Sequence, residues 1–227
     1  GQFGNISLSG FDGTFERERD GWRVEARTDV MVGKESLEIR GDGNYFYNSR
    51  RLDGAVLFNG LEPDLLLSHL PERLVDISVS SRLSGSVAFS LQDFQSLESL
   101  DVIATATGGT IGYGPVLPEP LSYESLRFQI GYDSNENSVI LRNLIVDRGS
   151  MVVMLQGALK NLSSPELDLS TKITGLPVSD IKHYWPPELF EMARGWITQN
   201  LQDGTLAEIT ARVTGRMEIG AETRVRD

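Results

Sequence analysis

The chain has 227 residues, of which 40% are hydrophobic and 23% are charged, the composition of a folded globular protein rather than a disordered one. Its net charge of −11 argues against nucleic acid as a partner and against docking on an anionic bilayer, since both require clustered Lys and Arg. It has no cysteine for disulfides or thiolate chemistry, and no apolar run of about 18 residues that would span a membrane.

Apolar and polar residues alternate with period two along most of the chain, which predicts strands with one apolar and one polar face. Short turns between the strands are typical of an antiparallel meander. The expected strands cover residues 3–10, 21–32, 35–40, 44–48, 52–60, 79–89, 98–107, 124–132, 138–147, 151–160, 166–174 and 209–219. The turn signals between them are Asp12-Gly13, Asp20-Gly21, Asp42-Gly43-Asn44, Asp53-Gly54, Asp133-Ser134-Asn135 and Arg148-Gly149.

One segment of the sequence recurs later in the chain. Residues 58–74 resemble residues 173–189, and Gly60 and Gly175 occupy matched positions 115 residues apart. In both copies a proline follows the matched glycine at a distance of 11 residues. The recurrence predicts a protein built from repeats.

A second match follows the first in the same order. Residues 79–89 resemble residues 209–219 at an offset of 130, so the second copy has 15 additional residues between its two matched blocks. Gly85 and Gly215 interrupt the apolar row at corresponding places, which predicts a bend or bulge in both copies.

The two copies predict two β-modules, 1–97 and 98–227, with a proline-rich linker at about 114–120. Helix is expected at 64–70, at its equivalent 179–184, and in the insertion at about 187–202, which begins with a proline and ends before a glycine. The predicted fold is therefore mostly β: a long antiparallel meander, strongly curved and twisted, open as a trough and built from repeats, with two short helical insertions.

Motifs that carry chemistry are scarce. His69 and His183 are not at matched positions and lack a zinc-ligand spacing. The glycine-rich stretch 108–114 leads into extended proline-rich chain rather than into a helix N-terminus, so we do not interpret it as a phosphate loop. With 32 carboxylates, a glycosidase-type pair stays open as an alternative. We expect no enzyme, no catalytic residue, no metal and no cofactor.

Several short motifs, taken in order, resemble the AsmA-like superfamily of bacterial envelope proteins, most closely its large YhdP- and TamB-type members. The resemblance covers residues 98–219 well and 36–97 more weakly. The motifs that carry it are Tyr113-Gly114-Pro115-Val116-Leu117-Pro118, Leu126-Arg127-Phe128, Leu155-Gln156-Gly157, Leu167-Asp168-Leu169, Ile173-Thr174-Gly175-Leu176, Tyr184-Trp185-Pro186, Ala193-Arg194-Gly195-Trp196-Ile197, Asn200-Leu201-Gln202-Asp203-Gly204 and Thr214-Gly215-Arg216-Met217. Copy one lacks the inserted helix and its tryptophan.

The resemblance implies that this chain is a piece of a longer protein, anchored in the inner membrane and crossing the periplasm. It implies a bridge-like lipid transport protein of the cell envelope, concerned with outer membrane homeostasis. An apolar β-sheet groove would shield the acyl chains of phospholipids moving between the inner and outer membranes. The membranes would be contacted by parts of the parent chain outside these 227 residues, and an isolated fragment with an exposed groove would tend to associate with itself.

Under this interpretation, alternation assigns the groove lining. The candidates are Val79, Leu83, Val87, Phe89, Leu126, Phe128, Ile130, Val139, Leu141, Ile209, Val213, Met217 and Ile219. Leu189 and Trp196 of the inserted helix would plug or border the groove.

Two alternatives remain open. The sheet could fold over and bury its own apolar row, so that each of these residues is an ordinary core residue. The chain could also be a structural or adhesin-like β-repeat scaffold with a closed core, although a solenoid would show a nearly constant period of about 20–30 residues.

Overall fold

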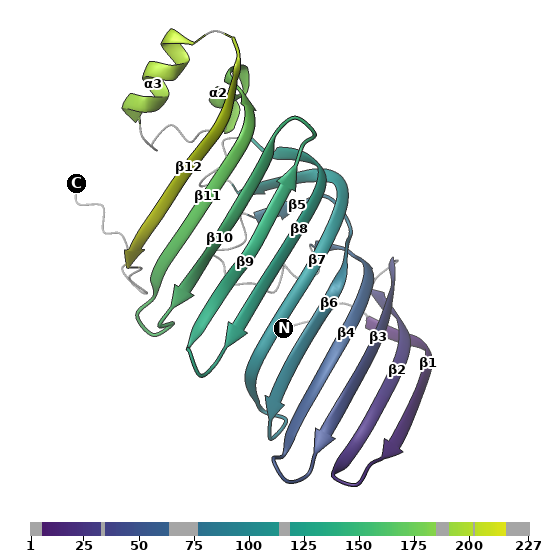
Figure 1. Ribbon diagram of the computed structural model, residues 1–227. Helices are drawn as coiled ribbons and strands as arrows, with labels where there is room; N and C mark the ends of the chain where they lie inside the picture. The colour runs from purple at the N-terminus through teal and green to yellow at the C-terminus, as the bar shows by residue number, and fades with distance from the viewer. Residues whose placement is uncertain are drawn as a thin grey trace, which may run out of the picture.

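The computed structural model describes residues 6–32, 35–63, 77–113, 119–184, 191–201 and 203–216. Within them, twelve strands form one antiparallel sheet (Figure 1). The strands are β1 (Ile6–Arg17), β2 (Gly21–Val32), β3 (Glu35–Phe46), β4 (Arg51–Leu61), β5 (Ile77–Val79), β6 (Leu83–Gln92), β7 (Ser96–Tyr113), β8 (Leu121–Asp133), β9 (Ser138–Asp147), β10 (Val152–Lys160), β11 (Glu166–Pro177) and β12 (Thr205–Arg216).

The sheet is a meander in which strands that follow one another in the chain lie side by side, in the order β1-β2-β3-β4-β6-β7-β8-β9-β10-β11-β12. The short β5 pairs with the C-terminal end of β7, along the same edge that β6 pairs with further down. The prediction of a long, mostly β, antiparallel meander is confirmed.

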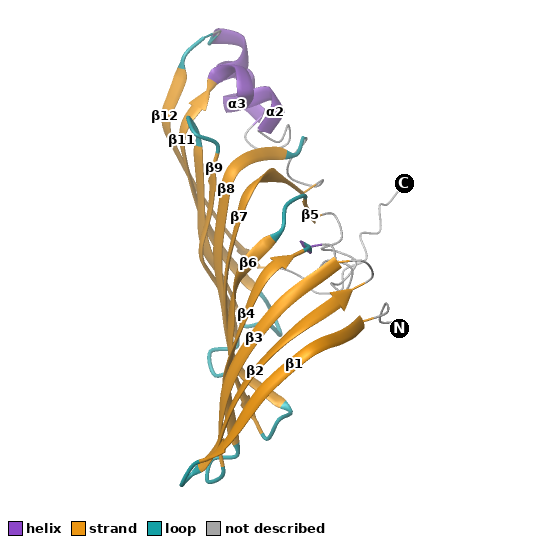
Figure 2. Ribbon diagram, turned by 90° about the vertical axis from the view of Figure 1, so that its right-hand side faces the viewer, coloured by secondary structure: helices purple, strands orange, loops and turns teal. Residues whose placement is uncertain are grey.

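The prediction of strong curvature is wrong. The sheet is twisted but not strongly curled (Figure 2). Tight curling needs closely spaced bulges or a closing pair of edge strands. Here the register shifts are isolated, with one in each of five strand pairs. No described strand joins β1 to β12.

Three of the predicted turns lie inside strands instead. Asp12-Gly13 is within β1, Asp42-Gly43-Asn44 is within β3, and Asp53-Gly54 is within β4. Gly43 and Gly54 are partners across the β3–β4 ladder. Neighbouring side chains occupy the space above them, with Leu52 at Gly43 and Phe89 at Gly54. These glycines make room for neighbouring side chains within the sheet, and they do not form turns.

The helical part of the second copy follows β11. A single 3₁₀ turn, η2 (Val178–Asp180), leads into α2 (Ile181–Tyr184), and α3 (Glu191–Asn200) precedes β12. The helices expected at 179–184 and 187–202 are thus present in the parts described. The other expected insertion, 64–70, lies outside the described residues, as does most of the linker, 114–118.

The first sequence match is described in both copies only at residues 58–63 and 173–178, and there the matched glycines share a conformation. Gly60 and Gly175 both adopt positive φ, +84° and +70°, near the ends of β4 and β11. The second match is wrong as a structural equivalence. Phe58 pairs with Gly85, and its match Ile173 pairs with Ile209, so strand pairing relates the copies at an offset of 124 (209 − 85) rather than 130.

Of the predicted bend or bulge at Gly85 and Gly215, the bulge is not found at either residue, although a register shift in the β4–β6 pair lies beside Gly85, between Leu83 and Ser84. The predicted boundary between modules, at residues 97 and 98, falls within β7, which pairs with both β6 and β8. The division into two modules stays a prediction.

Buried residues gather at one end of the sheet, beneath the helices. Ile181 is fully buried there, and Val178 and Leu176 are nearly so. The other buried residues of this core are Leu83, Ala106, Leu121, Tyr123, Leu126, Val146 and Met151.

Candidate functional site

The sheet has one continuous apolar face. Residues paired across neighbouring strands point to the same side of a sheet, so the register defines rows of side chains. The row through Val87 crosses all eleven strands of the meander without a polar residue. Its members are Gly13, Ala26, Gly41, Val56, Val87, Val102, Ile130, Leu141, Gly157, Leu169 and Val213.

The rows on either side have the same character. Towards the hairpin that joins β6 to β7, the next row holds Phe15, Val24, Gly43, Gly54, Phe89, Leu100, Tyr132, Val139, Leu159, Leu167 and Gly215. Towards the helices, the next row holds Thr28, Ile39, Phe58, Gly85, Ala104, Phe128, Leu144, Leu155, Thr171 and Ala211. Its two threonines are the only polar residues in these three rows.

The structure brings the predicted lining residues together on this face. Val87, Phe89, Phe128, Ile130, Val139, Leu141 and Val213 belong to the three rows, and Val79, Leu83, Leu126 and Ile209 lie nearer the helices, in or against the buried core. Met217, Ile219 and Leu189 lie outside the described residues.

Sequence reasoning missed most of the face. Val24 and Ala26 on β2, Val56 and Phe58 on β4, and the alternating positions of β7 all belong to it. The signal was available, because these strands show the same period-two alternation as the strands that were chosen. What was missing was the register that joins the strands.

The helices after β11 cover one end of this face (Figure 2). Tyr184, Ile197 and Leu201 pack against the buried core with one side of their helices. Trp196 lies on the outer side of α3, 61% exposed, and it is not part of that core. The helices therefore cap the end of the face through Ile181, Ile197 and Leu201.

Away from the cap, the apolar face is only half covered. The only described elements outside the sheet are η2, α2 and α3. Val56, Val87 and Val102, in the middle of the sheet, are neither buried nor fully exposed, and Val213 at the end is 48% exposed. Within the described part of the chain, the centre of the face is thus open to a ligand.

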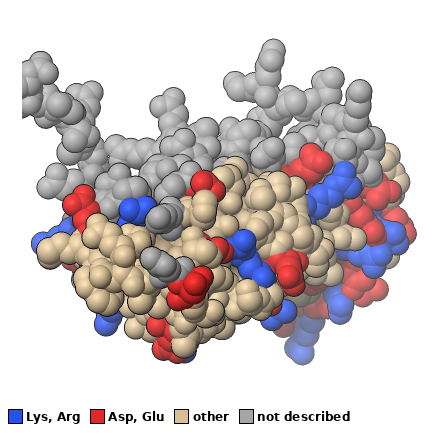
Figure 3. Space-filling view, turned by 90° about the horizontal axis from the view of Figure 1, so that it is seen from above, with Lys and Arg blue, Asp and Glu red and all other residues tan. Residues whose placement is uncertain are grey.

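The opposite face is mostly polar and crossed by ion pairs, although Leu57, Ile103 and Met154 are also exposed on it. Figure 3 looks down on the molecule from above rather than onto this face, and in that view Lys and Arg lie close to Asp and Glu. The ion pairs on this face are Arg23–Glu25, Arg27–Glu38, Arg40–Glu38, Arg51–Asp53, Arg142–Asp101, Arg212–Asp168, Lys172–Glu208 and Arg216–Glu166. Surface pairs of this kind contribute little stability each, but they keep this face hydrated.

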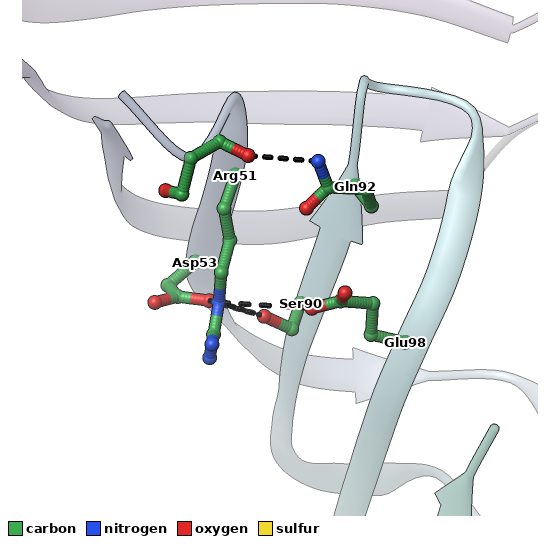
Figure 4. Close-up of polar contacts among 6 residues, drawn as sticks. Arg51, Asp53, Ser90, Gln92 and Glu98 are labelled. Atoms are coloured by element: carbon green, nitrogen blue, oxygen red, sulfur yellow. Dashed lines mark hydrogen bonds and ion pairs between the residues drawn. The ribbon is translucent and has the colours of Figure 1, made fainter. Parts of the chain in front are cut away.

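A hollow of about 650 Å³ lies on the polar face between β3 and β9. At its wall, Arg51 Nε donates to Asp53 Oδ1 at 2.7 Å, and the buried hydroxyl of Ser90 also donates to that oxygen (Figure 4). Partial burial raises the pKa of Asp53, but these hydrogen bonds outweigh it, so the pKa lies below its usual range. The hydrogen bonds of this cluster link β4 to β6.

Among the described residues, no group of His, Asp and Glu is arranged to hold a metal ion. No helix in the described ranges is long and apolar enough to cross a membrane. No protein family, curated protein or solved structure matches the chain.

Proposed function

We propose that the chain is a segment of a bridge-like lipid transport protein, in which the open apolar face shields the acyl chains of phospholipids. The observation that carries the proposal is the row through Val87, which crosses eleven strands with only apolar residues and glycine. The role is non-enzymatic: the face offers a surface, and no residue is proposed to act in catalysis.

The dimensions suit acyl chains. Neighbouring strands lie about 4.8 Å apart, so a row across eleven strands is about 48 Å long. A bilayer core of about 30 Å holds two acyl chains end to end, so the face could hold about three in line. Each methylene removed from water contributes about 0.8 kcal/mol, and a row without polar interruption keeps that contribution nearly constant as a lipid slides.

The two faces of the sheet support this assignment. One face has the ion pairs and only scattered apolar side chains, whereas a half-exposed apolar face of this length is unusual for a protein without a ligand or partner. The resemblance to AsmA-like envelope proteins supports the periplasm as the compartment, an inner-membrane anchor elsewhere in the parent chain, and transport between the two membranes.

A structural scaffold is the second candidate, favoured by the closed, buried core beneath the helices. Leu126 and Val146 there are 2% exposed, so that end of the face binds no ligand. A scaffold would close the remainder of the face in the same way, in the parent protein or against another copy.

The test is organic extraction of the purified chain followed by lipid mass spectrometry. Val87→Glu places a charge in the middle of the apolar row, and Ser86→Glu places the same charge on the neighbouring residue of β6, which faces the polar side. We expect stoichiometric phospholipid in the wild type and in Ser86→Glu, and loss of at least about tenfold in Val87→Glu.

Circular dichroism establishes whether each variant is folded. If Val87→Glu unfolds, Val213→Glu at the more exposed end of the same row replaces it. A wild-type chain free of lipid, or a folded Val87→Glu variant with full lipid content, would reject the lipid groove and favour the scaffold.

A further inference from the structure

The apolar face reaches one row beyond the row of Phe89, to the turns at the end of the sheet opposite the helices (Figure 1). From β2 to β7 this outermost row holds Trp22, Tyr45, Leu52, Leu91 and Leu97. Tyrosine and tryptophan combine an apolar ring system with one polar group, so they suit a boundary between an apolar surface and water. The row therefore forms a rim between the open face and the solvent around the turns.

Two neighbouring turns place more aromatic rings against this rim. Phe94, between β6 and β7, stacks on Tyr45 with ring centroids 4.8 Å apart, and Tyr47, between β3 and β4, meets Tyr45 edge to face at 5.8 Å. The N–H of Asp93 donates to the Arg50 carbonyl oxygen at 2.9 Å, and the side chains of the same two residues form an ion pair of 2.7 Å, so the turns are joined. We refer to Tyr45, Tyr47, Arg50 and Phe94 as the rim cluster.

The stability of the fold does not account for Phe94. Asp93 and Phe94 have φ values of +56° and +57°, as in the type I′ turns that favour glycine and asparagine. A bulky side chain is unfavourable in this conformation, and the ring is 58% exposed, so burial offsets little of that cost. An exposed ring held on an unfavourable backbone indicates a role in binding.

The rim cluster also offers hydrogen-bond donors. No described residue forms a hydrogen bond with the hydroxyl of Tyr45 or Tyr47. Arg50 is 69% exposed and binds Asp93 through Nε, which leaves the other N–H groups of its guanidinium for a second acceptor. Phosphate oxygens accept strong hydrogen bonds from such a donor, because charge strengthens the bond.

We propose that the rim cluster binds the headgroup end of a phospholipid whose acyl chains lie on the apolar face. The phosphate and ester oxygens lie at Tyr45, Tyr47 and Arg50, and the ring of Phe94 packs on the glycerol and the first methylenes. The inference rests on the proposed function, because the acyl chains need the open face. The rim is continuous with that face, whereas the opposite side of the face ends in the buried core beneath the helices.

Two single-chain probes separate the headgroup from the acyl chain: a lysophospholipid and an alcohol with the same chain length. Isothermal titration calorimetry gives the Kd of each probe. We expect the wild type to bind the lysophospholipid about tenfold more tightly, roughly the contribution of one hydrogen bond to a charged group. Arg50→Asn and Phe94→Asn should each lose most of this preference and keep the Kd of the alcohol. Asparagine tolerates positive φ, so both turns should keep their backbone.

Phe46→Asn is the matched control. Phe46 is 39% exposed and lies next to Tyr45 in β3, so its side chain points to the opposite face. This variant should bind both probes as the wild type does. Thermal unfolding shows whether each variant is folded, and Phe94→Asn should be at least as stable as the wild type.

The outcomes distinguish the rim site from the proposed function. A wild type that binds neither probe would reject the proposed function and the rim site with it. Binding of both probes with equal Kd, with a preference that Arg50→Asn and Phe94→Asn retain, or with a preference that Phe46→Asn also loses, would overturn the rim site alone. A marked loss of stability in Phe94→Asn would do the same, since the ring would then serve the fold.

Discussion

The ring of Phe89 on β6 lies over Gly54 on β4, its direct partner across the ladder. A Cβ on Gly54 would come within 2.7 Å of Phe89 Cζ and within 3.2 Å of the Asp42 carbonyl oxygen. The glycine leaves a depression in the apolar face, and the ring fills it. The small residue on β4 thus makes room for the large side chain on β6.

Gly54→Ala is therefore expected to destabilise the protein by about 1–2 kcal/mol, because the ring must move from its place. Gly41→Ala is the matched control on β3. Its Cβ would meet its nearest atoms at 3.4 and 3.6 Å, an ordinary contact, so reduced backbone freedom in the unfolded chain should give a neutral or slightly stabilising effect, up to about 1 kcal/mol. Urea unfolding of both variants measures the difference, and equal effects would contradict the role of Phe89.

Gly85 and Gly215 occupy matched positions in the sequence but have different surroundings in the structure. A Cβ on Gly85 would lie 2.0 Å from the backbone oxygen of Ile103, which cannot move without disturbing the β6–β7 ladder. Among the described residues, a Cβ on Gly215 would meet nothing within 4 Å. We expect Gly85→Ala to cost about 2–4 kcal/mol and Gly215→Ala to cost less than about 0.5 kcal/mol. Thermal unfolding of the two variants tests this, and similar losses would restore the equivalence that the sequence match suggested.

Local pattern was sufficient for the strands and for the side to which each residue points. Alternation along β6, β8, β9 and β12 placed the predicted lining residues correctly on one face, because the period of two is a property of each strand alone. It was not sufficient for the continuous row, since Val87, Val102 and Ile130 become neighbours only through the register of three strands.

Turn chemistry failed for a related reason. Asp42-Gly43-Asn44 has the composition of a hairpin turn, but Gly43 pairs with Gly54 inside the sheet. Glycine is required at Gly54 because the Phe89 ring of the neighbouring strand occupies the space of a Cβ, and that requirement is invisible in the local sequence. The lack of strong curling also depends on how few register shifts the whole sheet contains, and no single segment encodes that number.

The helical cap depends on Ile181, which is fully buried at the start of α2. Ile181→Ala removes its contacts with the core beneath the helices, so we expect a loss of about 2–4 kcal/mol. Trp196→Ala removes a larger side chain that faces outward, and we expect a loss below about 0.5 kcal/mol. Chemical unfolding of the two variants makes the comparison. A larger loss from Trp196→Ala would show that the tryptophan borders the groove as the sequence suggested.

The hydrogen bonds of Asp53, which link β4 to β6, make the free energy of unfolding depend on pH. Asp53 loses its usual hydration on partial burial, yet the hydrogen bonds from Ser90 and Arg51 lower its pKa below the ordinary value of about 4. A carboxyl whose pKa is lower in the folded state contributes stability above the pKa of the unfolded chain and loses it as the pH falls through the folded pKa. The side chain is 39% exposed, so water screens the pair and its contribution should stay below about 1 kcal/mol.

Asp53→Asn tests this dependence. It should lower stability at pH 7 and flatten the fall in the free energy of unfolding as the pH drops from about 4, because the variant has no carboxyl to protonate at this position. Ser90→Ala removes one of the two donors and should give an intermediate slope. Urea unfolding between pH 7 and pH 2.5 measures all three proteins. Parallel curves for wild type and Asp53→Asn would mean that the pKa of Asp53 is the same in the folded and unfolded chains.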